Sequence, residues 1–192
     1  GSFDAMQHCI AHPRKTEKTA GVFFEKDDSG SALKTAAAYL CCLFSDIRIE
    51  RSIFLAEKLK IIPLGGLDEI GKNITVLEYG KDMIVIDCGV GFPDEEMYGV
   101  DLVIPDFTYL TQNAKKLRGL FVTHGHEDHI GGISFLLQSV NIPVIYGAQT
   151  SIDLIKNKLE DRNIGYNNLE VINGDTRIKT KHFDIEFIAT TH

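Results

Sequence analysis

The sequence predicts an α/β domain over residues 59–192, preceded by a mainly helical segment over residues 1–58 that carries no recognisable motif. Short apolar runs typical of strands alternate with apolar residues at helical spacing, a pattern typical of mixed α/β folds. The composition, 44% hydrophobic and 24% charged, is that of a globular protein with a sizeable core. The net charge of −7 falls entirely within residues 59–192, which favours a boundary near Lys58.

Residues 1–58 are expected to form a separate, unassigned segment. Gly1-Ser2 resembles a cloning scar, and residues 32–44 are expected to form an apolar packing helix. A signal-peptide core is the alternative, and the acidic pair Asp27-Asp28 before it argues against that interpretation. No apolar run approaches the roughly 18 residues of a membrane-spanning helix. The four cysteines form no Cys-x-x-Cys pair, so we expect a cytoplasmic protein without a membrane partner.

The first strands of the α/β domain are predicted from apolar runs and turn residues. Residues 60–64 form a short apolar strand. Residues 74–79 and 83–87 flank Gly80-Lys81, which is typical of a β-hairpin.

Helices and strands then alternate along the chain. The expected order is a helix near 107–117, a strand at 119–123, a helix at 133–140, a strand at 142–146 and a helix from 150 to 159. Thr150 is predicted to cap that last helix. Residues 183–190 alternate between apolar and polar and predict the last strand. His182 lies in the polar turn before it and is expected at the surface.

The stretch that follows the predicted strand at 119–123 concentrates metal-ligand side chains. Its potential ligands, all within six residues, are His124, His126, Asp128 and His129. Imidazole nitrogens and carboxylate oxygens suit zinc and, less often, manganese. Because side chains alternate along a strand end, His124 and His126 are expected on one side, and Asp128 with His129 can address a second position nearby. Two neighbouring metals can hold a phosphoryl or acyl group and acidify a water. The alternative is a solvated polar loop. That alternative explains poorly why four potential ligands follow a buried strand directly.

The H-x-H-x-D-H pattern of residues 124–129 resembles the signature of the metallo-β-lactamase superfamily. Further stretches resemble the β-CASP nucleases of that superfamily, and ribonuclease J in particular: 64–73, 85–89, 91–93 and 99–106. The resemblance runs nearly continuously over residues 59–192. It implies the N-terminal half of a metallo-β-lactamase αβ/βα sandwich, truncated before the β-CASP domain.

The resemblance also implies roles for individual residues. His124, His126 and His192 would hold one metal ion. Asp128 and His129 would contribute to a second, and Asp128 would in addition position the attacking hydroxide. Zinc is implied at two sites in the parent protein, with manganese or magnesium as alternatives.

Asp87 ends a predicted apolar strand. The resemblance implies that it supports the metal ligands from behind, where such a group orients them and tunes their basicity. A strand-end aspartate that caps the next turn is the alternative.

The implied function is a metal-dependent ribonuclease in RNA processing and decay, including rRNA processing. It would bind RNA and cleave its phosphodiester bonds as an endonuclease, a 5′-to-3′ exonuclease or both. The chain itself is expected to be an inactive fragment, because further ligands would follow His192. The net charge of −7 argues against RNA binding by this part alone. The alternatives are a hydrolase of small esters or thioesters and a non-catalytic interaction module.

Half of a sandwich is expected to leave strands without neighbours. On this view residues 74–79, 83–87 and 183–190 would present unpaired backbone. We therefore expect homo-oligomers, unless residues 1–58 fold over the gap.

Overall fold

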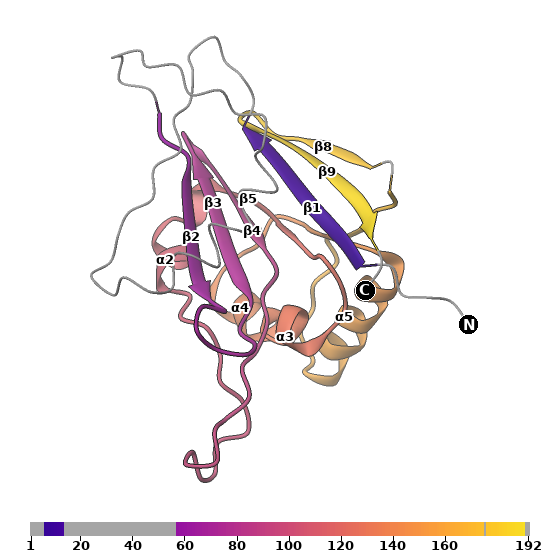
Figure 1. Ribbon diagram of the computed structural model, residues 1–192. Coiled ribbons are helices and arrows are strands. Elements are labelled where there is room, and N and C mark those ends of the chain that lie inside the picture. Colours follow the sequence, from indigo (N-terminus) through magenta and orange to yellow (C-terminus); the bar gives the residue numbers. More distant parts are fainter. Residues whose placement is uncertain (1–5, 14–56, 175, 191–192) are drawn as a thin grey trace.

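The computed structural model describes residues 6–13, 57–174 and 176–190, of which residues 6–13 and Thr190 are described by their backbone alone (Figure 1). The described residues form three layers: helices, a six-stranded sheet, and a three-stranded sheet on the other face of the large sheet. The predicted α/β fold is confirmed. In this part of the chain, no helix has the length and apolar character needed to cross a membrane.

The larger sheet has the strand order β2-β3-β4-β5-β6-β7. Its strands are β2 (Lys60–Gly65), β3 (Ile74–Tyr79), β4 (Asp82–Ile86), β5 (Leu117–Phe121), β6 (Ile145–Gly147) and β7 (Leu169–Val171). Neighbours from β2 to β4 are antiparallel, and neighbours from β4 to β7 are parallel. Tyr79 pairs with Asp82, which confirms the hairpin predicted about Gly80-Lys81.

Parallel neighbours need crossover connections, and helices supply them on one face of the large sheet (Figure 1). They are α2 (Thr108–Gln112), the 3-10 turn η1 (Ala114–Lys116), α3 (Glu127–Ile130), α4 (Ile133–Ser139) and α5 (Gln149–Asp161). The helix predicted over residues 107–117 is shorter than expected, because Leu117 already pairs with Met83 in the sheet. The predicted cap at Thr150 is wrong: α5 begins at Gln149, and its N-cap is Ala148, two residues before the predicted one.

The smaller sheet has the order β1-β9-β8, with antiparallel neighbours. Its strands are β1 (Met6–Pro13), β8 (Arg177–Lys179) and β9 (Phe183–Thr190). Met6 lies opposite Thr190 and Pro13 opposite Phe183, so β1 runs along the whole of β9. The expected helical character is therefore wrong for residues 6–13, and the helix expected at residues 32–44 lies outside the described residues.

The three strands that were expected to lack neighbours have them on both sides. β3 lies between β2 and β4, β4 lies between β3 and β5, and β9 lies between β1 and β8. The predicted unpaired edges on these strands are wrong. The alternative, that residues 1–58 cover the gap, is confirmed for β9, because β1 lies within residues 1–58 and pairs with β9, while β2 pairs with β3. The expectation of homo-oligomers rested on those edges and stays a prediction.

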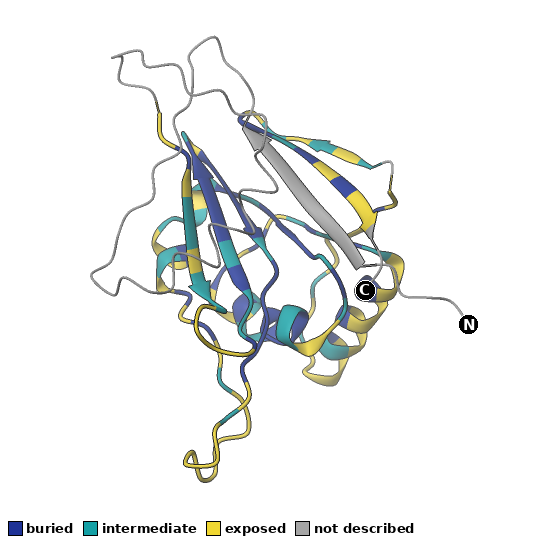
Figure 2. Ribbon diagram, viewed as in Figure 1, coloured by how far each residue is buried: buried dark blue, intermediate teal, exposed yellow. Residues whose placement is uncertain are grey.

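Alternation along the strands gives the large sheet two buried faces. Met83 and Val85 of β4 pack toward the helices, whereas Ile84 between them packs toward the small sheet. The inward residues of β9, all fully buried, are Phe183, Ile185 and Phe187. Burial of each such side chain stabilises the fold by about 1.5–3 kcal/mol. Figure 2 shows the resulting concentration of buried residues along the strands of the large sheet.

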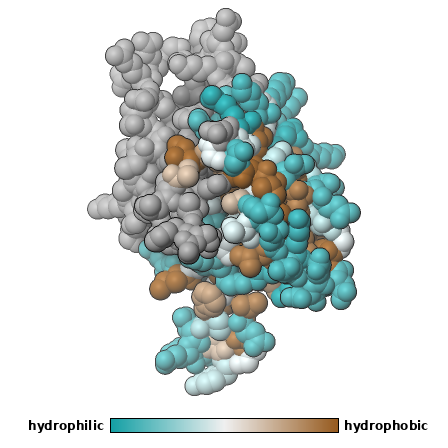
Figure 3. All heavy atoms as spheres, turned by 90° about the vertical axis from the view of Figure 1, so that its right-hand side faces the viewer, coloured by the Kyte–Doolittle hydropathy of each residue, from teal (hydrophilic) through white to brown (hydrophobic). Residues whose placement is uncertain are grey.

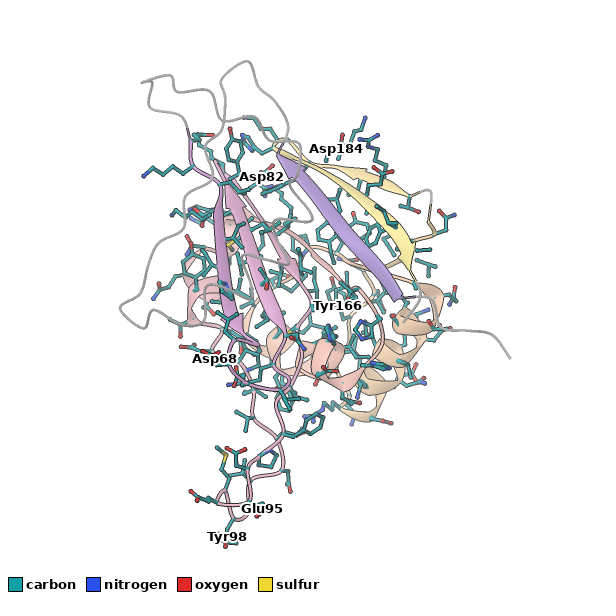
Figure 4. All side chains as sticks on the ribbon, in the orientation of Figure 1. Asp68, Asp82, Glu95, Tyr98, Tyr166 and Asp184 are labelled. Carbon is teal, nitrogen blue, oxygen red and sulfur yellow. The ribbon has the colours of Figure 1, made fainter. Side chains whose placement is uncertain are left out.

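Asp82 joins the two sheets at the end of the molecule opposite α3 (Figure 4). Its carboxylate is only 1% exposed and accepts hydrogen bonds from Arg118 Nε (2.6 Å), Thr180 Oγ1 (3.0 Å) and the backbone N of His182 (2.9 Å). Nδ1 of His182 lies 3.0 Å from the same carboxylate. The prediction that His182 lies at the surface is wrong, because the turn before β9 folds onto the start of β4.

More than half of the exposed large hydrophobic side chains in the described residues lie between residues 92 and 104. Residues 92–104 project from the body of the molecule, with Glu95 and Tyr98 near the tip, and Gly91 pairs with Val103 at the base (Figure 4). On the face that presents β8 and β9, hydrophobic side chains lie among hydrophilic ones (Figure 3).

Candidate metal centre

The predicted metal ligands follow β5 and lie around the start of α3. The carbonyl oxygen of His126 accepts hydrogen bonds from the backbone N of His129 and of Ile130, both at 2.9 Å. The helix therefore starts directly after His126. This single turn places Asp128 and His129 beside His124, which is buried at the end of the strand.

The four side chains form two donor pairs, each made of two atoms that could donate a lone pair to a metal ion. Nε2 of His124 lies 3.1 Å from Nδ1 of His126, and Nε2 of His129 lies 3.5 Å from Oδ2 of Asp128. The pairs adjoin each other, since the ring centroids of His124 and His129 are 4.0 Å apart. The structure thus brings together the four ligands predicted in this stretch. His192, the fifth predicted ligand, lies outside the described residues.

Both pairs fit a metal ion by their chemistry and their spacing. Zinc–nitrogen bonds of about 2.0–2.1 Å in a tetrahedron place neighbouring donors about 3.3 Å apart, close to both measured spacings. Within residues 57–174 and 176–190, however, no three imidazole, thiol or carboxylate groups are arranged as a metal site. Each pair therefore provides part of a coordination shell and needs further donors.

Asp87 lies behind the ligands and is 5% exposed. It follows β4 with a positive φ of 58°, which turns its carboxylate toward the end of β5. Its Oδ1 accepts a hydrogen bond from the backbone N of Thr123 (2.8 Å), and its Oδ2 lies 2.7 Å from Thr123 Oγ1 and 2.8 Å from His129 Nδ1. Asp87 therefore contacts both the strand end and His129, and its supporting role for a bound metal stays a prediction.

The Asp87 carboxylate also determines which nitrogen of His129 faces the centre. A carboxylate only accepts hydrogen bonds, so Nδ1 of His129 donates, and in the neutral ring the lone pair is on Nε2. Burial lowers the pKa of His129, but the hydrogen bond and charge of Asp87, together with the charge of Asp128, raise it more. The pKa of His129 therefore lies above its ordinary value.

Asn73 is a residue of the site to which the sequence reasoning gave no role. Its backbone N donates to the carbonyl oxygen of Asp128 (3.0 Å), and its Nδ2 donates to the same oxygen (3.1 Å) and to Asp128 Oδ2 (3.2 Å). Nδ2 also lies 3.2 Å from Nε2 of His129. Asn73 thus orients the Asp128–His129 pair from the loop before β3. The sequence feature that could have indicated this role is the position of Asn73 in the stretch 64–73, which carries part of the resemblance.

The loop after β4 braces α3 through backbone hydrogen bonds. The N of Cys88 donates to His129 O (2.7 Å), and the N of Gly132 donates to Cys88 O (2.8 Å). Cys88 is fully buried, and burial raises the pKa of its thiol far above the ordinary value. Cys88 therefore acts here as a packing residue, and its backbone holds the C-terminal end of the ligand helix.

Ion pairs border the centre. Lys158 of α5 pairs with Glu127 of α3, and Lys72 lies 2.8 Å from Glu69. Lys158 neutralises the carboxylate of Glu127, which lies between His126 and Asp128 in the chain. A concentration of carboxylates is expected around bound cations, because a metal ion is the largest local charge in such a site.

A comparison with protein families matches residues 67–190 to the family described as the metallo-beta-lactamase superfamily. The chain is 46% identical over 138 residues to ribonuclease J of Synechocystis sp., a match that covers 71% of this chain and 22% of that protein. It is 42% identical over 134 residues to ribonuclease J of Mycoplasma pneumoniae, which covers 69% of this chain and 24% of that protein. The chain thus spans less than a quarter of the length of these relatives.

Solved structures give a weaker likeness. Rubredoxin oxygen:oxidoreductase from Desulfovibrio gigas has a TM-score of 0.39 and 14% sequence identity, covering 67% of this chain and 32% of that one.

Proposed function

The chain belongs to the metallo-beta-lactamase superfamily, and on that premise we propose that it is part of a metal-dependent ribonuclease that hydrolyses phosphodiester bonds of RNA. The observation that carries this proposal is the identity of 42–46% with proteins named ribonuclease J over 69–71% of the chain. The paired donors at residues 124–129 support it, because they lie inside the matched range and have the chemistry of metal ligands.

Zinc is the metal that we propose, with manganese or magnesium as alternatives. His124 and His126 would hold one ion, with His192 as a further nitrogen ligand. Asp128 and His129 would hold the second. Bound at these positions, the metals would supply positive charge to the reacting phosphoryl group and acidify the attacking water.

The chain's own residues determine how these groups are presented. Asp87 keeps the proton of His129 on Nδ1 and so directs Nε2 to the centre. Asn73 fixes the Asp128 carboxylate through Nδ2, and from that position Asp128 would also orient the attacking water.

RNA is the proposed substrate and binding partner. It would be cleaved internally, from its 5′ end, or in both ways. The net charge of −7 makes this part of the protein a poor phosphate-binding surface by itself. We therefore place that surface in the remaining three quarters of the length seen in the relatives. We also propose that the enzyme acts in the cytoplasm, in RNA processing and decay, including rRNA processing.

The test is cleavage of a 5′-labelled single-stranded RNA by the longer protein that contains this chain. We expect cleavage that requires added zinc, manganese or magnesium and that is lost in His126→Ala. Glu160→Gln, which alters an exposed carboxyl group on α5, is the matched control and should cleave normally. The 192-residue chain alone is expected to be inactive.

The same assay separates the alternative functions. Hydrolysis of thioesters or small esters without RNA cleavage would favour a small-molecule hydrolase. Activity on neither substrate, by a folded and metal-loaded protein, would favour a non-catalytic interaction module. Either result would overturn the ribonuclease proposal.

A further inference from the structure

We propose that Thr123 is a positioning residue of the metal centre: its hydroxyl group connects the Asp87 carboxylate to Nδ1 of His124 and thereby directs Nε2 of His124 toward the metal. The inference rests on the proposed metal-dependent function and deepens it. Thr123 supplies no atom to the metal itself and acts only through His124.

The geometry forms a short chain of hydrogen-bonding atoms. Oγ1 of Thr123 lies 2.7 Å from Oδ2 of Asp87 and 3.0 Å from Nδ1 of His124. Thr123 is half-buried, whereas His124 and Asp87 are buried. In such surroundings a polar group without a hydrogen-bond partner is unfavourable, so we expect each hydrogen to lie on the donor that these distances require.

The direction of each hydrogen bond follows from the inventory of donors. The Asp87 carboxylate has no hydrogen to give, so the Thr123 hydroxyl must donate to it. A threonine hydroxyl has a single hydrogen, and with that hydrogen used, Oγ1 can only accept. Nδ1 of His124 must therefore be the protonated nitrogen, which leaves the lone pair of the neutral ring on Nε2. That nitrogen is the one that faces Nδ1 of His126 at 3.1 Å.

The same oxygen of Asp87 acts directly on the other donor pair. Oδ2 accepts from Nδ1 of His129 at 2.8 Å as well as from Thr123 Oγ1. One buried carboxylate thus fixes a tautomer in each pair, directly for His129 and through Thr123 for His124. In both rings the proton is on Nδ1 and Nε2 faces the centre.

A substitution can separate this role from a structural one. The backbone N of Thr123 donates to Asp87 Oδ1 at 2.8 Å, and that bond survives any change of the side chain. Thr123→Val keeps the shape and the backbone bond and removes only the hydroxyl. Thr123→Ser keeps the hydroxyl. Thr111→Val removes a hydroxyl that bonds to the Phe107 carbonyl oxygen, away from the centre, and is the matched control.

The first measurement is the tautomer of His124 in the metal-free 192-residue chain, read from long-range proton–nitrogen NMR correlations of labelled histidines. We expect Nδ1–H in the unaltered chain, in Thr123→Ser and in Thr111→Val, and a mixture of tautomers or Nε2–H in Thr123→Val. The second is zinc affinity by competition with a chelator. Loss of a group that orients a metal ligand costs about 10–100-fold in affinity, and we expect that loss in Thr123→Val alone.

An unchanged His124 tautomer in Thr123→Val would overturn the proposal, as would Nε2–H in the unaltered chain. If Thr123→Val does not fold, Thr123→Ala provides the same comparison. The tautomer requires neither RNA nor bound metal, so it decides the role of Thr123 even if the protein fails to cleave RNA, a result that would count against the proposed function alone.

Discussion

Gly89 lies directly against the backbone of Asp128, so close that a Cβ atom at position 89 would be 1.6 Å from the Asp128 carbonyl oxygen and 2.8 Å from the backbone N of His129. Both neighbours are backbone atoms and cannot turn aside as a side chain would. The absence of a side chain at this position therefore fixes how closely the ligand helix α3 approaches the loop after β4.

Gly89→Ala is expected to displace α3 and both donor pairs. We expect a loss of at least about 1–3 kcal/mol in the free energy of unfolding, the usual cost of overpacking, together with weaker zinc binding. Urea unfolding and a zinc titration measure the two effects. Gly165→Ala is the control, because a Cβ atom there would meet nothing within 4 Å. Unchanged stability and zinc affinity in Gly89→Ala would contradict the close packing.

A second prediction concerns pH and Asp82. Burial raises the pKa of this carboxyl group, but the hydrogen bonds from Arg118, Thr180 and His182 lower it more, so the pKa in the folded chain lies below the ordinary value. The stability it contributes is complete above the unfolded pKa of about 3.9 and is lost as the pH falls through the lower folded value. We therefore expect the free energy of unfolding to fall below about pH 4.

Asp82→Asn removes this contribution, because an amide keeps the shape and carries no charge. We expect a loss of about 1–3 kcal/mol at pH 7, typical of buried hydrogen bonds to a charged group, and a smaller further loss on acidification. Urea unfolding at pH 7 and pH 3 measures both. Asp153→Asn, at an exposed position on α5, is the control. An equal acid sensitivity in Asp82→Asn and the unaltered chain would assign the effect to other carboxyl groups.

The parts of the fold that could be predicted from the sequence are those that the pattern of neighbouring residues determines. The Gly80-Lys81 turn determines the β3–β4 register, and the buried residues Ile152, Ile155 and Leu159 of α5 follow from helical spacing. The proximity of the four ligands follows from their spacing along one strand end and one helical turn.

The rest depended on contacts between distant residues. Met6 pairs with Thr190, and nothing in the sequence near either residue indicates that partner. His182 reads as a surface residue until Asp82, 100 positions earlier, is placed against it. Asn73 likewise reaches Asp128 only because the fold brings β3 and α3 together.

A third prediction concerns His126, which is exposed. His126→Ala removes a donor without opening the core, so we expect zinc binding at the His124–His126 pair to be lost while the free energy of unfolding of the metal-free chain changes by less than about 0.5 kcal/mol, as for other surface substitutions. Zinc titration and urea unfolding measure the two. Unfolding of the chain in response to this substitution would indicate a structural metal instead.

The last prediction concerns β1. It pairs with β9 over eight residues, from Met6 opposite Thr190 to Pro13 opposite Phe183. Removal of residues 1–58 would leave the backbone of β9 without a neighbour on one side, and an open strand edge is a template for pairing with another chain. We expect lower solubility or larger oligomers.

Sedimentation of the full chain and the truncated chain at several concentrations measures this effect. A shorter deletion, of residues 1–13, tests β1 itself and should reproduce most of the change, whereas deletion of residues 1–5 leaves β1 whole and should not. The chains that lack residues 6–13 could instead be monomeric and as stable as the full chain. In that case β1 does not protect β9, and the open edge of β9 does not cause association.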